Sequence, residues 1–182
     1  MAAAGAGEEK TYVEDVFSTY LYPGNDSNIA VNNGIDISTE GGLVWIKNRD
    51  TAGYGHFLFD TERGTTKAIG ANLNNAEFTE AKGVHTFSTN GFTIGGSGGD
   101  AAFNSDGVSY ASWTFRKAPG FFDVVTWSGD GNANRQISHS LGCVPGAIFA
   151  KRLNVSENWL CYHKGMGNEK YIHLNLTNAM GD

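Results

Sequence analysis

The sequence is poor in basic residues. Lys and Arg together number 13 against 19 Asp and Glu, no basic run occurs, and the formal net charge is −6. Proteins that bind nucleic acid through its phosphates concentrate positive charge on one surface. The composition therefore predicts that nucleic acid is not a partner.

Long apolar runs are missing as well. No segment approaches the ~20 apolar residues that cross a bilayer, and residues 1–7 (MAAAGAG) lack the charged and long apolar regions of a signal peptide. We expect no membrane insertion and no secretion by the ordinary route. Residues 1–10 are too poor in apolar side chains to pack alone and are predicted to form a flexible N-terminal arm.

Cysteine is scarce, and no catalytic or metal motif occurs. Cys143 and Cys161 are too few for a disulfide scaffold and do not form a CxxC motif. Ser138, His139 and Ser140 adjoin one another, but no GxSxG nucleophile elbow accompanies them. The histidines are scattered, without the spacing of zinc ligands, at His56, His85, His139, His163 and His173. The sequence predicts no enzyme, no metal site and no cofactor.

Glycine, by contrast, is abundant. The 25 glycines, 3 prolines and 12% aromatic residues are typical of short strands joined by tight turns, so we expect an all-β fold. Asn90-Gly91 predicts a β-hairpin with a type I′ turn. In the strand at 108–115 the alternation leaves open which face is buried. Further strands are expected at 16–22, 43–46 and 56–60.

The most informative feature is a repeat. Residues 67–76 (KAIGANLNNA) recur as 170–179 (KYIHLNLTNA), a shift of 103 residues. Common order and near-constant spacing of further matches indicate a duplication. These weaker matches have shifts of 105, 104 and 102 residues and pair 22–25 with 127–130, 42–47 with 146–151, and 56–59 with 158–161.

The duplication divides the chain into a first unit at residues 11–117 and a partial second unit at 118–182. Relative to the first unit, the second lacks a counterpart of residues 77–117. A half sandwich exposes an apolar face and unpaired strand edges, so we expect a neighbouring copy, the first unit or further polypeptide to cover it. Residues 121–127 should form a strand, and Cys161, aligned with Phe59, should be a small buried apolar residue.

Several segments resemble a domain of virion proteins from marine bacteriophages. They are 16–22 (VFSTYLY), 42–49 (GLVWIKNR), 58–64 (LFDTERG), 92–95 (FTIG) and 137–142 (ISHSLG), and the resemblance covers roughly residues 11–180. It implies a lectin-like, jelly-roll β-sandwich in the phage tail. By analogy with phage fibres, the chain would be the N-terminal, particle-anchoring part of a tail fibre involved in host attachment. Such a fibre is expected to be a homo-oligomer, with a trimer favoured, in contact with other tail proteins.

Four aromatic residues are candidates for an interface or for stacking on a ligand: Trp127, Trp159, Tyr20 and Tyr22. Tryptophans within apolar strand runs favour core packing, but the incompleteness of the second unit makes Trp127 and Trp159 candidates. A host-surface glycan would be the ligand. The alternatives are a capsid decoration protein and a carbohydrate-binding or carbohydrate-active sandwich. The latter needs paired carboxylates, and Asp60 with Glu62 are better explained by ion pairing with Arg63 or by solvation.

Overall fold

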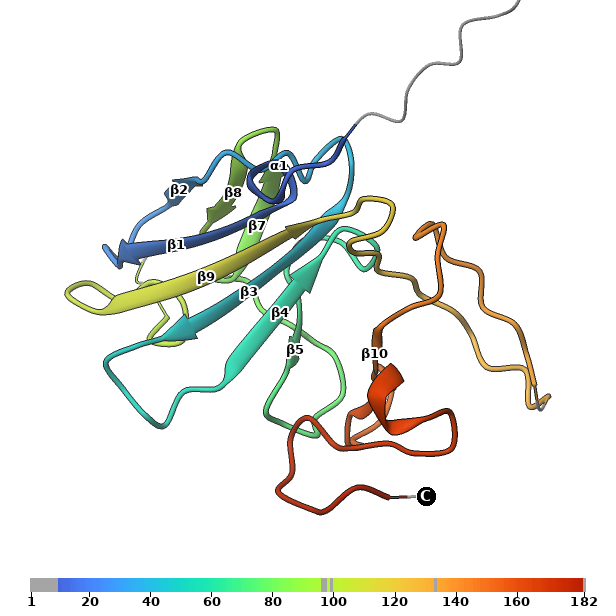
Figure 1. Cartoon of the computed structure of the whole chain (residues 1–182). Helices are drawn as coiled ribbons and strands as arrows, with labels where there is room; N and C mark the ends of the chain where they lie inside the picture. Colours follow the sequence, from blue (N-terminus) through green and yellow to red (C-terminus); the bar gives the residue numbers. More distant parts are fainter. Residues whose placement is uncertain (1–9, 96–97, 99, 133, 182) are drawn as a thin grey trace, which may run out of the picture.

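A computed structural model describes residues 10–95, 98, 100–132 and 134–181, so the predicted N-terminal arm lies outside the described residues except for Lys10. The chain forms an antiparallel β-sandwich (Figure 1). The six-stranded sheet has the order β1 (Phe17–Pro23), β9 (Ser109–Arg116), β3 (Gly42–Asn48), β4 (His56–Asp60), β5 (Lys67–Gly70) and β6 (Phe78–Thr79). The second sheet has the order β2 (Ile29–Asn32), β8 (Gly91–Ile94) and β7 (Val84–Ser88). The prediction of an all-β sandwich is confirmed.

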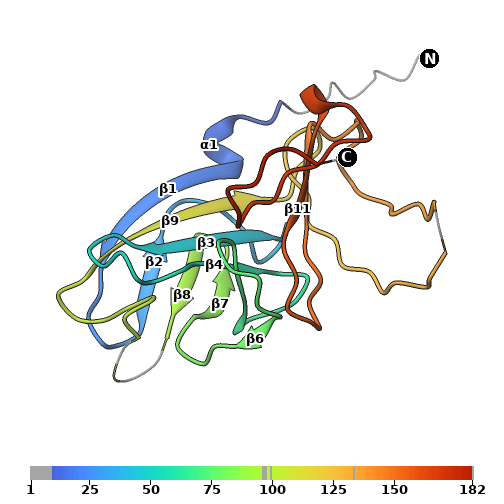
Figure 2. The same cartoon turned by 90° about the horizontal axis from the view of Figure 1, so that it is seen from below.

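The main core lies between these two sheets, which Figure 2 shows as stacked layers. Alternation along β3 places Val44 and Ile46 in the core and Trp45 on the opposite face. On β9 the buried face carries Tyr110, Ser112 and Thr114, which decides the question that the alternation left open. The hydroxyl of Thr114 accepts a hydrogen bond of 2.7 Å from the side-chain amide of Asn33. Burying this hydroxyl therefore costs little free energy, because its oxygen has a hydrogen-bond partner.

The turn after β4 is held by a buried ion pair. The Arg63 Nε lies 2.5 Å from the Asp60 carboxylate, and both side chains are almost fully buried. Glu62 instead pairs with Lys117, at 2.8 Å, so the two carboxylates have separate partners. Of the two explanations that the sequence offered for these carboxylates, ion pairing with Arg63 holds for Asp60 but not for Glu62. The guanidinium also contacts the Glu77 carboxylate and the carbonyl oxygens of Lys67 and Leu58.

Two local predictions need correction. The hairpin of β7 and β8 is present, but Asn90 does not have the positive φ that a type I′ turn requires. Gly91 alone does, with φ of 130°, and a Cβ there would lie 2.0 Å from a backbone oxygen of β2. At the N-terminus, the predicted strand begins only at Phe17. A one-turn helix, α1 (Val13–Val16), precedes it, and the Asp15 carboxylate accepts the Tyr12 N–H at 3.4 Å.

The C-terminal part has far less regular structure. Strands β10 (Ala147–Ala150) and β11 (Leu160–His163) form a hairpin, followed by the short 3-10 helix η1 (Lys164–Met166). Residues 121–127 were predicted to be a strand, and this is wrong: they make one isolated bridge, between Ala118 and Phe122, and otherwise run without pairing into the hollow described below.

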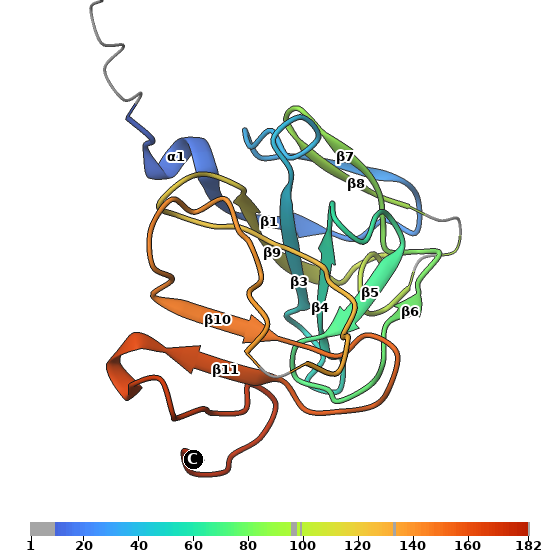
Figure 3. The same ribbon diagram turned by 90° about the vertical axis from the view of Figure 1, so that its right-hand side faces the viewer.

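The hairpin of β10 and β11 packs beside β4 and β5, against the face of the larger sheet that points away from the main core (Figure 3). Trp159 and Cys161 are buried there against Leu58, Ile69 and Ala71. The indole N–H of Trp159 donates a hydrogen bond of 2.8 Å to the Gly70 carbonyl oxygen. Cys161 is unpaired and buried, as predicted for a small apolar residue, and burial raises the pKa of its thiol.

Candidate functional site

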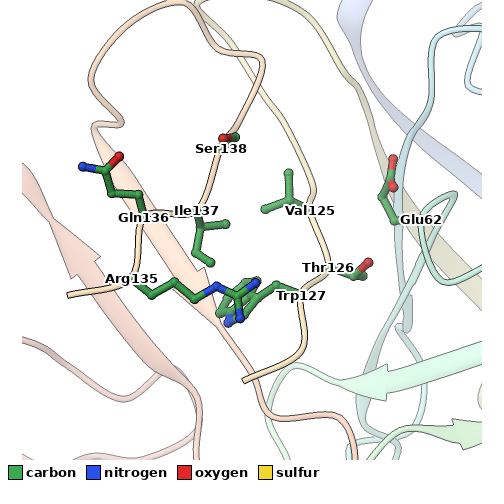
Figure 4. A pocket seen from close by; sticks show the side chains of 8 residues that line it. All are labelled: Glu62, Val125, Thr126, Trp127, Arg135, Gln136, Ile137 and Ser138. Carbon is green, nitrogen blue, oxygen red and sulfur yellow. The ribbon is translucent and has the colours of Figure 1, made fainter. Parts of the chain in front are cut away.

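The candidate site is a hollow of about 360 Å³ in the C-terminal part. Two extended segments of the chain line it, residues 125–127 and residues 135–138, and Glu62 of the first unit contributes to its lining as well. Figure 4 shows these segments facing each other, with the Arg135 side chain extending toward Trp127. The Arg135 guanidinium donates to the Ser128 carbonyl oxygen, which holds it beside the tryptophan.

An ion-pair network fixes the segment that carries Trp127. The Lys117 ammonium lies 2.8 Å from the Glu62 carboxylate and 3.1 Å from that of Asp123. Partial burial lowers the pKa of Lys117, but the two carboxylates outweigh it, so the pKa is raised. Partial burial also raises the pKa of Asp123, yet the Ser140 N–H and the Lys117 ammonium hold it below its usual range. The network therefore ties the start of the second unit to the first.

The hollow combines an apolar ring with polar groups. Trp127 is 51% exposed, so about half of its side chain reaches solvent. The hollow is also lined by a guanidinium, a side-chain amide, a hydroxyl and a carboxylate, from Arg135, Gln136, Ser138 and Glu62. Aromatic faces with nearby hydrogen-bonding groups suit polar ring-shaped ligands. The lining of the hollow suits the binding of such a ligand, but it shows no nucleophile aligned with a base.

The four aromatic candidates separate into two groups. Trp127 and Tyr20 are exposed, on the hollow and on β1 respectively. Tyr22 is buried, stacks on Tyr110 and donates its hydroxyl to the Phe103 carbonyl oxygen at 2.9 Å. Trp159 is buried between the hairpin and the sandwich. The expectation that Tyr22 and Trp159 stack on an external ligand is therefore corrected, because neither ring is accessible from solvent.

A second feature agrees with the exposed apolar face expected of a partial unit: the second unit carries most of the exposed large apolar side chains in the described part of the chain. Ten of the fifteen exposed large apolar residues in the described part of the chain lie in it. They are Phe121, Trp127, Val144, Ile148, Phe149, Val155, Leu160, Ile172, Leu176 and Met180. Contiguous exposed apolar surface marks a place where another polypeptide packs. The sequence predicted an exposed apolar face for the partial unit, but not which side chains would form it.

The described residues contain no group of three or more His, Cys, Asp or Glu side chains placed to hold a metal ion. No helix in the described part of the chain combines the length and the apolar character that a membrane span requires.

Comparison with known proteins gives one match. A family model described as a domain of unknown function (DUF7483) matches residues 13–182, nearly the whole chain. No curated protein and no solved structure matches.

Proposed function

The chain belongs to the DUF7483 family, and we propose that it is a non-enzymatic structural component of a phage particle. In this proposal it is the N-terminal, particle-anchoring part of a tail fibre involved in host attachment. It works in the virion as a homo-oligomer, a trimer, in contact with other tail proteins. The segments that resemble virion proteins of marine bacteriophages, such as residues 42–49 (GLVWIKNR), supply the phage context.

One structural observation carries the proposal. A closed sandwich is joined to a second β-unit whose exposed apolar side chains need further polypeptide to cover them. Such a surface favours a role as a subunit of a larger assembly over a role as an isolated enzyme. The hollow at Trp127 supports the same view, since it offers binding groups without a nucleophile and base in contact.

The location is tested by immunogold electron microscopy of purified particles, with an antibody against the sandwich. The proposal expects label on the tail. Label over the head would instead assign a capsid decoration protein, and particles without label would refute a virion role. Sedimentation of the protein released from particles should give three times the mass of its single chain, whereas a monomer would refute the trimer.

Carbohydrate binding is the second candidate function, and the exposed ring of Trp127 favours it. Sugars stack on exposed aromatic faces. The Arg135 guanidinium can donate hydrogen bonds to their hydroxyl oxygens, and the Gln136 side-chain amide can both donate to and accept from their hydroxyls. A host-surface glycan would then be the ligand of the fibre.

A glycan array tests this second candidate directly. If the hollow binds sugar, Trp127→Ala should weaken binding about fivefold, because one stacking contact contributes on the order of 1 kcal/mol. Tyr54→Ala is the matched control, since Tyr54 is exposed but does not line the hollow. Equal binding by wild type and Trp127→Ala, or no binding by either, removes the candidate.

A further inference from the structure

The hairpin of β10 and β11 repeats the pairing of β3 and β4 residue by residue. Leu43, Val44, Trp45 and Ile46 on β3 face Asp60, Phe59, Leu58 and Phe57 on β4. Ala147, Ile148, Phe149 and Ala150 on β10 face His163, Tyr162, Cys161 and Leu160 on β11. These four pairs of β3 and β4 give the four pairs of β10 and β11 when 104 is added to the residue number on the first strand and 103 to that on the second. The register aligns Cys161 with Leu58, which corrects the sequence alignment of Cys161 with Phe59.

Two bridges beyond the hairpin follow the same shift. Leu58 pairs with Ile69 between β4 and β5, and Cys161 pairs with Ile172. In the next pair of strands Ala68 faces Phe78, and 103 residues later Tyr171 faces Gly181. The order of strands in the first unit, β3-β4-β5-β6, therefore recurs as a four-segment sheet that ends at residue 181.

Hydrogen bonds at the strand ends repeat as well. The His56 N–H donates to the Asn72 side-chain oxygen at 2.8 Å, and the Trp159 N–H donates to that of Asn175 at 3.0 Å. The Thr61 N–H donates to the Gly42 carbonyl oxygen at 3.0 Å, and the Lys164 N–H donates to that of Gly146 at 2.9 Å. Alternating apolar patterns alone do not produce matched loop contacts, so residues 146–181 are a structural copy of residues 42–78.

Among the described residues, the second copy has no counterparts of β9 and β8, the strands that pair with β3 and β2 in the first. There β3 lies between β4 and β9, whereas β10 pairs with β11 alone among the described residues. In the first copy β1 pairs with β9, and β2 pairs with β8. The segments that correspond to β1 and β2 at a shift of 105, residues 122–128 and 134–137, form no strands. The absence of their partner strands explains why residues 121–127 are not a strand.

The side chains that would be the core of the second copy are exposed. Val44 is fully buried, but its counterpart Ile148 is 46% exposed, and Leu160 on the same face is also exposed. The opposite face, which carries Cys161, already packs on the first sandwich. Trp127 is the counterpart of the buried Tyr22 at a shift of 105 and lines the hollow. The hollow thus lies between the segments that correspond to β1 and β2, where a second core would form.

We propose that the outer edge of β10 and the face carrying Ile148 and Leu160 receive strands equivalent to β7, β8 and β9, supplied by polypeptide that follows residue 182. In the first copy these strands come directly after β6, at residues 84–116, so their counterparts fall at about 187–219. A second copy of this chain has no such strands to offer, because its own β7, β8 and β9 are paired within its first sandwich. The added strands complete the second sandwich by strand addition to an open edge.

The test compares the 182-residue chain with the same chain extended by the roughly 40 residues that follow in its gene. Hydrogen exchange of the β10 amides is measured in both. The proposal expects exchange to slow about 100-fold or more in the extended chain, because the edge amides become paired and buried. Unchanged exchange, or a reading frame that closes at residue 182, overturns it. Concentration-dependent protection in the 182-residue chain, with a doubled mass, would assign the surface to a second copy and also overturn it.

Matched substitutions locate the effect. In the extended chain, Ile148→Asp should restore fast exchange along β10, because a charge would enter the new core. Val144→Asp should leave the slow exchange intact, since Val144 is highly exposed and precedes β10. If both variants behave alike, the added residues do not pack on this face. This inference extends the proposed assembly role but is tested on isolated protein, so it can hold even if labelled particles refute a place in the virion.

Discussion

Replacing the buried Arg63 by methionine should destabilise the sandwich far more than the same change at an exposed arginine. The Arg63 side chain is 5% exposed and its Asp60 partner 3%, with an Nε to carboxylate distance of 2.5 Å. Arg63→Met would leave the Asp60 carboxylate buried without its cation and would remove the hydrogen bonds to two carbonyl oxygens. Removing one partner of a buried ion pair in this way lowers the free energy of unfolding by about 3–5 kcal/mol.

Arg152→Met is the matched control. Arg152 pairs with Glu157 at 3.0 Å, but the two side chains are 62% and 50% exposed, so the loss should stay below about 1 kcal/mol. Urea unfolding followed by tryptophan fluorescence measures both. With a slope of about 2 kcal/mol per molar urea, the midpoint should fall by about 1.5–2.5 M for Arg63→Met and by less than about 0.5 M for Arg152→Met. Equal shifts would refute the reasoning that burial makes this ion pair important.

Three further predictions concern the turns, the contact between units and pH. Gly91→Ala should lower the melting temperature several times more than Gly34→Ala, because both residues have positive φ but only Gly91 would clash with a backbone oxygen. Trp159→Ala removes a buried side chain that contributes about 3–5 kcal/mol to the packing of the second unit on the first. Limited proteolysis with mass spectrometry should therefore show faster cleavage after residue 117 while the sandwich stays intact. Equally fast cleavage along the whole chain would contradict this. The pKa of Asp123 is lowered in the folded chain, so its carboxylate stabilises the fold above its ordinary pKa of 3.8 and this contribution is lost as pH falls below that value. The gap in urea midpoint between wild type and Asp123→Asn should therefore close between pH 5 and pH 2.5, and a gap that widens on acidification would contradict the sign.

The local pattern of the sequence was enough to predict the class of fold and several strands. The short apolar run at 43–46 predicts a strand because glycines and a polar turn bound it. The alternation along 108–115 predicts one because side chains on a strand point alternately to two faces. The ion pair of Asp60 with Arg63 was predictable for a similar reason, since the two residues are close in sequence and share a turn. Where periodicity and short spacing decide the structure, the sequence is sufficient.

Partners distant in sequence were not predictable. Residues 17–23 and 121–127 have similar strand-forming composition, yet only the first is a strand, because β9 pairs with it across some 90 residues of chain. Tyr22 and Trp127 likewise occupy matching positions in the repeat, but one is buried and the other is exposed. A segment with high strand propensity forms a strand only where a neighbouring strand pairs with its backbone N–H and C=O groups.

The sequence by itself determined the all-β class, the repeat and the scarcity of catalytic and basic motifs. The tertiary structure alone decided which face of each strand is buried and which aromatic rings reach solvent. It also decided that the second unit packs, through Trp159 and Cys161, on the face of the first sandwich that points away from the main core. The physical reason is that alternation of residue types along a strand shows only that its two faces differ in polarity. Which face becomes the core depends on the long-range strand that arrives to cover it.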